Sequence, residues 1–142
     1  MSLSSDSCLK RIRLLVEQAG CQEVCEQRVR EACLDNNFDP TVAAKQLIRE
    51  EQLKIYLEEL CGRLGQQPNK EFISTCCLKY KFAQEQVEQY ILKLFKAKTK
   101  VINECKKANL KMPNDAQLNH LILFYYGHWQ TVLHNIREGL WY

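Results

Sequence analysis

The stretch CLDNNF at residues 33–38 returns as CLKYKF at residues 77–82, with identical residues at three positions and an offset of 44. Downstream of each stretch, the aliphatic pairs Leu47-Ile48 and Ile91-Leu92 keep the same offset. Self-similarity at a period of 20–50 residues is typical of repeat proteins, in which each copy is one supersecondary unit. The sequence therefore predicts an internal repeat.

Helical periodicity surrounds these stretches, because apolar residues recur at three- and four-residue steps along nearly the whole chain. Only 5 Gly and 3 Pro occur, which disfavours an all-β architecture. Asp39-Pro40 is expected to cap and open a long helix, since neither Gly nor Pro follows until Gly62. We predict an all-α fold of about seven helices, in which tandem units share long helices and an αα-hairpin follows.

The last third of the chain differs in its residues. Asn114 or Asp115 is expected to cap an apolar helix that ends near Phe124, and Gly127 to turn the chain into a helix that begins at Trp129. Phe124 and Trp129 are candidate partner-binding residues because aromatic side chains dominate binding hot spots. The alternative is that they belong to an ordinary core.

Composition sets limits on function. The 142 residues are 46% hydrophobic and 26% charged with a net charge of +3, as in ordinary globular proteins. No run of eighteen apolar residues occurs, and the N-terminus lacks the form of a signal peptide. We expect a soluble cytoplasmic or nuclear protein that does not insert into membranes.

The middle of the chain is basic, since residues 79–111 carry nine Lys against three Glu, a net charge of +6. Such a stretch is either the solvated face of a long helix or a surface for phosphate groups. The second reading gives the alternative function, binding of RNA or DNA. Its candidate residues are Lys93, Lys96, Lys100, Lys106 and Lys107.

Chemistry-bearing motifs are few. The eight cysteines include no Cys-x-x-Cys pair, so we expect buried free thiols, with Cys21 and Cys25 as the best metal candidate. No phosphate loop, nucleophile elbow or metalloprotease helix occurs. We therefore assign no catalytic residue, no cofactor and no metal site, and do not expect an enzyme.

The N-terminal third resembles the ubiquitin-associated (UBA-like) three-helix superfamily over residues 8–50. The segments that carry this resemblance are LVEQAGC at 15–21, VREAC at 29–33, NNFD at 36–39 and AAKQLI at 43–48. Residues 53–95 look like a degenerate second copy. The C-terminal hairpin is similar, more loosely, to units of tetratricopeptide- or pentatricopeptide-type arrays. These likenesses divide the chain into a UBA-like unit at 1–52, a basic second unit at 53–111 and a hairpin at 112–142.

In the UBA-like family, ubiquitin docks on the loop after the first helix and on the end of the third. The resemblance therefore implies contact residues Ala19, Gly20, Cys21, Leu47 and Ile48. Ala19 and Cys21 stand where the family usually has larger apolar residues, so the fold is a firmer expectation than ubiquitin binding. The function expected is protein–protein interaction, as an adaptor or scaffold that includes ubiquitin or a ubiquitin-pathway component among its candidate partners.

Overall fold

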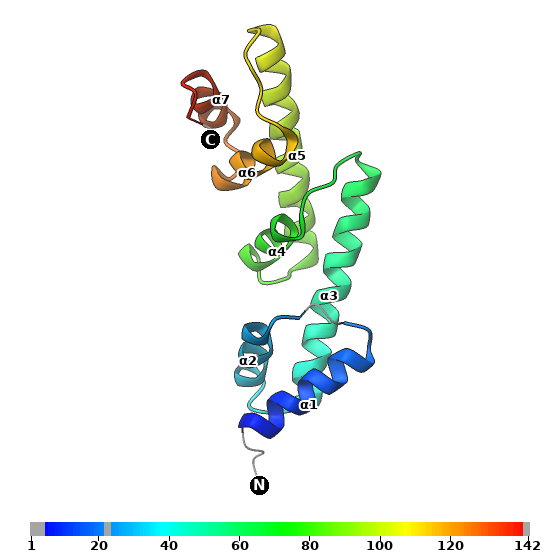
Figure 1. The fold of residues 1–142 in the computed structure, drawn as a ribbon. Coiled ribbons are helices and arrows are strands. Elements are labelled where there is room, and N and C mark those ends of the chain that lie inside the picture. Colours follow the sequence, from blue (N-terminus) through cyan, green and yellow to red (C-terminus); the bar gives the residue numbers. More distant parts are fainter. Residues whose placement is uncertain (1–4, 22–23, 141–142) are drawn as a thin grey trace. The chain divides into compact units, whose positions relative to one another are not determined.

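The computed structural model describes residues 5–21 and 24–140, and this part of the chain forms seven α-helices and no strand (Figure 1). The predicted all-α class is confirmed. The chain divides into two compact units, Met1–Tyr56 and Leu57–Tyr142. Within the described ranges no helix is long and apolar enough to cross a membrane.

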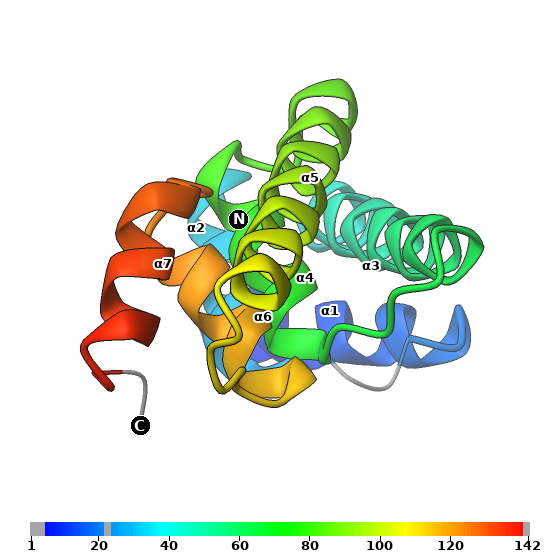
Figure 2. The same cartoon turned by 90° about the horizontal axis from the view of Figure 1, so that it is seen from above.

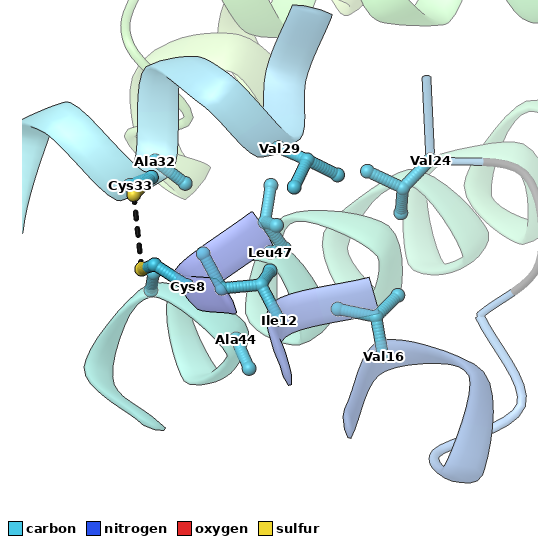
Figure 3. Packing of buried hydrophobic residues seen from close by; sticks show 10 residues of the cluster. Cys8, Ile12, Val16, Val24, Val29, Ala32, Cys33, Ala44 and Leu47 are labelled. Carbon is cyan, nitrogen blue, oxygen red and sulfur yellow. Dashed lines mark hydrogen bonds between the residues drawn. The ribbon is translucent and has the colours of Figure 1, made fainter. Parts of the chain in front are cut away.

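The first unit contains α1 (Ser5–Gln18), α2 (Glu26–Asp35) and the first part of α3 (Pro40–Arg63). Gly20, at a φ of +85°, follows the end of α1, and Asp39 Oδ1 accepts the N–H groups of Thr41 and Val42 at the start of α3, where the cap was expected. Side chains from all three helices meet in one core (Figure 3). Its buried members are Cys8, Ile12, Val16, Val24, Val29, Ala32, Cys33, Ala43, Ala44 and Leu47.

The second unit contains α4 (Lys70–Lys79), α5 (Gln84–Lys107), α6 (Asp115–Phe124) and α7 (Trp129–Arg137). Helix α5 is its central element, since α4, α6 and α7 all contact it (Figures 1 and 2). Asn69 caps α4, and Asn114 forms a full capping box with Gln117 on α6. The expected helix start at Asn114 is thus confirmed.

Each unit also holds one buried charged group with a tertiary partner. Glu50 in α3 is 6% exposed and accepts a hydrogen bond of 2.7 Å from Arg28 in α2. Lys98 in α5 is 2% exposed, and its Nζ donates to Gln66 Oε1 and Asp115 Oδ1, each at 2.6 Å. A buried charge is costly unless it is paired, so these contacts fix how the helices of each unit meet.

Three turns of the chain share one backbone geometry. The N–H groups of Phe38, Phe82 and Gly127 bond to carbonyls five residues earlier, at 2.9, 2.8 and 2.8 Å. In each turn two consecutive residues have positive φ: Asn37-Phe38, Lys81-Phe82 and Tyr126-Gly127. The predicted repeat is therefore confirmed at residues 33–38 and 77–82. The same turn recurs a third time, 45 residues further on.

Helix boundaries follow the same period. Helices α2, α4 and α6 have 10 residues each, and α3 and α5 have 24 each. We call α2–α3, α4–α5 and α6–α7 the first, second and third pairs. The last third of the chain is thus a third copy of the repeat, which corrects the expectation that it differs.

Buried residues occupy equivalent places in all three copies. Each copy consists of the C-terminal part of one helix, the short helix that follows it and the N-terminal part of the next long helix. Helix α1 therefore corresponds to the second halves of α3 and α5, so each long helix serves two neighbouring copies. Equivalent buried triplets are Ile12, Leu57 and Val101; Val16, Cys61 and Cys105; Val29, Ile73 and Leu118; Cys33, Cys77 and Ile122; and Leu47, Ile91 and Ile136.

Candidate functional site

The five residues implied by the UBA-like resemblance do not form one open surface. Ala19 and Gly20 are exposed, and Cys21 and Ile48 are half-buried. Leu47 is 2% exposed and lies in the core of the first unit (Figure 3), so its side chain offers almost no surface to a partner. Ile48 also packs against this core. The surface left for a partner is small and mostly backbone and short side chains.

The third pair carries a larger apolar surface. A groove of about 450 Å³ runs along α6 and is lined by Phe124, Tyr125 and Leu140, together with Ala116, Gln117, His120 and Leu121. Phe124 is 62% exposed and Leu140 is 56% exposed. We call this feature the α6 groove.

Aromatic rings are ordered along one side of the α6 groove. The rings of Phe124 and Tyr125 meet edge to face at 4.9 Å, and that of His120 lies 6.1 Å from that of Phe124. Such contacts hold an exposed ring in one orientation, which lowers the entropy lost when a partner binds. Sequence reasoning found Phe124 but missed Leu140. The repeat could have pointed to Leu140, because it lies 45 residues after Phe95, and Phe95 stacks on Phe72 in the second pair.

Trp129 is not part of this groove. It is the first residue of α7 and is half-buried, and Lys100 Nζ of α5 lies 5.1 Å from the centre of its ring. The two aromatic candidates therefore belong to different surfaces. Phe124 faces the groove, and Trp129 is a cation–π partner of α5.

The five lysines of the nucleic-acid alternative are all exposed. Helical spacing places Lys93, Lys96, Lys100 and Lys107 on one stripe of α5 and Lys106 away from it. Glu104 offsets part of this charge, since its Oε1 lies 3.4 Å from Lys100 Nζ and 3.6 Å from Lys107 Nζ. These two lysines lower the pKa of the half-buried Glu104 carboxyl through hydrogen bonds and charge.

The cysteines are predominantly core residues. Six are buried, and the repeat explains four of them, since Cys33 matches Cys77 and Cys61 matches Cys105. Cys21 is half-buried and Cys25 is exposed. In the described ranges no group of three or more His, Cys, Asp or Glu side chains is placed to hold a metal ion.

Two cysteines of the first unit touch. Cys33 Sγ lies 3.0 Å from Cys8 Sγ, which joins α2 to α1 (Figure 3). Burial, and then the neighbouring Cys33 thiol, raise the pKa of Cys8 to about 12. Because the thiolate is the reactive form, the raised pKa slows the reaction of Cys8 with reagents.

One tyrosine of the second unit is buried without a hydrogen-bond partner among the described residues. The ring of Tyr90 meets the ring of Tyr80 edge to face, with ring centres 5.4 Å apart, and Cys76 is a further neighbour. Burial, followed by the charge of Cys76, raises the pKa of Tyr90 to about 12. Lys79 Nζ lies over the rings of Tyr90 and Tyr126 at 5.4 and 4.3 Å.

Comparisons of the chain with protein-family models, curated protein sequences and solved structures give no match. The UBA-like and tetratricopeptide-like resemblances therefore stay predictions. The α6 groove and the lysine stripe are the two surfaces whose geometry supports a function.

Proposed function

We propose that this chain is a protein–protein interaction module built from helix pairs, and that its partner binds in the α6 groove. The observation that carries this proposal is the juxtaposition of two large exposed apolar side chains, Phe124 and Leu140, in one groove. Full burial of such a side chain stabilises by about 1.5–3 kcal/mol. Two of them therefore contribute up to about 3–6 kcal/mol towards a weak interaction.

A photo-crosslinking residue in place of Phe124 tests this proposal in cells. We expect covalent adducts at this position, and we expect them to disappear when Leu140→Asp is added. The matched control carries the crosslinker at Tyr126, an aromatic residue that is 56% exposed and lies outside the groove. Equal adducts at both positions, or none at Phe124, would refute binding in the groove.

The UBA-like resemblance supports ubiquitin as one partner to test. Titration with monoubiquitin should shift the amide signals of Ala19, Gly20, Cys21 and Ile48 if the first unit binds it. Shifts confined to the amides around Phe124 would place ubiquitin in the α6 groove instead. An unchanged spectrum would remove ubiquitin from the candidate partners.

The lysine stripe supports RNA or DNA binding as a second candidate function. Lys93, Lys96 and Lys100 are exposed on one face of α5, and Trp129 beside Lys100 offers a ring for stacking. Binding of single-stranded RNA should weaken steeply with salt, because neutralised phosphates release counterions. The triple variant Lys93→Glu, Lys96→Glu, Lys100→Glu should abolish it. Unchanged binding by this variant would eliminate the candidate.

A further inference from the structure

The face of α6 that forms the groove has a counterpart on α4. Ala116, Gln117 and His120 lie 45 residues after Glu71, Phe72 and Thr75. Those three α4 residues line one side of a cleft of about 520 Å³, and α6 forms the other side through residues that include Asn119 and Leu123. In the second pair this face lies across the cleft from the short helix of the next pair, with Phe72 buried and Glu71 and Thr75 still exposed.

A helix equivalent to α6 is thus the expected occupant of the α6 groove, and the chain carries one with its docking side open. Helix α2 occupies the repeat position of α6, with Leu34 in the place of Leu123 and Arg30 in the place of Asn119. Leu34 is 62% exposed, and Arg30 is exposed as well. Leu123, by contrast, is half-buried in the cleft against α4.

Helices α7 and α1 match different parts of a long helix in repeat position. Helix α7 has 9 residues, equivalent to 84–92 of α5, and ends before Gly139, which has a φ of +71°. Helix α1 has 14 residues, equivalent to 94–107 of α5.

Their buried residues continue the same stripe. Val132 and Ile136 of α7 correspond to Val87 and Ile91 of α5. Cys8, Ile12 and Val16 of α1 correspond to three further buried residues of α5, Ala97, Val101 and Cys105.

We propose that the partner in the α6 groove is a second copy of this chain, bound head to tail, with its α2 on α6 and its α1 after α7. This inference rests on the proposed function, because it names the occupant of that groove. Different surfaces of the two copies meet, so the contact leaves one α2 and one α6 free at the ends. Assembly therefore grows with concentration and does not stop at a dimer.

Sedimentation velocity of the full chain from about 10 µM to about 1 mM tests this arrangement, since association follows mass action. We expect a mass that rises with concentration beyond two chains of 16.7 kDa. Leu34→Glu alone and Phe124→Glu alone should each be monomeric. An equimolar mixture should form dimers and nothing larger, because only one intact α2 face and one intact α6 face can meet.

Leu78→Glu is the matched control. It places the same charge at the repeat position of Leu34, but in α4, which takes no part in the proposed contact, and Leu78 is 52% exposed. Circular dichroism should show unchanged helix content in all variants. If Phe124→Glu loses helix content, Leu140→Glu takes its place in the mixture.

Three results would overturn the proposal: a chain that stays monomeric at every concentration, a mixture that stays monomeric, or a Leu34→Glu variant that still associates alone. The crosslinker at Phe124 separates this failure from failure of the proposed function. Adducts with other proteins from a monomeric chain would leave the groove a binding site and remove the second copy as its occupant. No adducts at all would reject both.

Discussion

Truncation of Leu47 separates a core role from a binding role in the aliphatic pair Leu47-Ile48. Leu47 is 2% exposed and packs among the residues of the first core, so Leu47→Ala removes buried methyl groups and leaves a cavity. Such substitutions cost about 3–5 kcal/mol. At about 0.05–0.15 kcal/mol per residue, the unit Met1–Tyr56 has a stability of only about 3–8 kcal/mol. We therefore expect Leu47→Ala to remove most of the stability of the first unit.

Urea unfolding followed by circular dichroism, with amide NMR signals assigned to each unit, measures this loss. Signals of the first unit should disappear at much lower urea than in the unsubstituted chain, while those of the second unit change little. Ile48→Ala is the matched control. Because Ile48 is half-buried, this substitution should lower the free energy of unfolding by about 1 kcal/mol. A cost below about 1 kcal/mol for Leu47→Ala would refute its place in the core.

Four further outcomes follow from individual groups. Tyr90→Phe removes a buried hydroxyl without a partner among the described residues and should raise the free energy of unfolding by about 1 kcal/mol in thermal melts; a loss would contradict this. Oxidised glutathione should join Cys8 to Cys33, with release of two reduced glutathione molecules and a mass loss of two hydrogens from the chain. The disulfide should raise the free energy of unfolding by about 3.5 kcal/mol. If mass spectrometry after long treatment still finds two free thiols, this prediction is refuted. Gly127→Ala should cost about 1–2 kcal/mol, because φ is +77° and a Cβ would lie 3.3 Å from a side-chain carbon of α5; an unchanged melting temperature would argue against this geometry. Burial raises the pKa of Cys76 from 9.0 to about 12, so the stability present below pH 9 should fall as the pH rises towards 12. In melts at different pH values, Cys76→Ala should flatten that decline. An equal decline in the variant would remove Cys76 as its cause.

The repeat could be predicted only where its turn kept its residues. The turn needs two consecutive left-handed residues, and three different pairs supply them: Asn37-Phe38, Lys81-Phe82 and Tyr126-Gly127. The first two pairs share a phenylalanine and were recognised through it. The third has glycine in that place, so the backbone conformation is kept while the matching residue is lost. Structure was needed to find the third copy.

The candidate sites show a similar division. Leu47 and Ile48 stand out in the sequence as an aliphatic pair, but the sequence pattern could not decide which of the two adjacent side chains points inward. Lys98 counted only as one more charge of the basic stretch. It is buried because Gln66 and Asp115, which are distant in sequence, accept its hydrogen bonds. Leu140 lines the α6 groove only because the fold brings residues that are distant in sequence together.

The sharing of each long helix between neighbouring copies makes the length of the chain adjustable in whole periods. Removal of residues 54–97 would join Leu53 directly to Lys98. Leu53 and Ala97 occupy the same repeat position, so the fused helix would keep its buried stripe in phase. Duplication of the same segment would lengthen the chain without interrupting a helix at the junction, because Ala97 would be followed by Lys54, the repeat equivalent of Lys98. Gene segments of this size can therefore be lost or copied while the remaining copies keep their cores, which gives evolution a simple way to change the number of surfaces the protein displays.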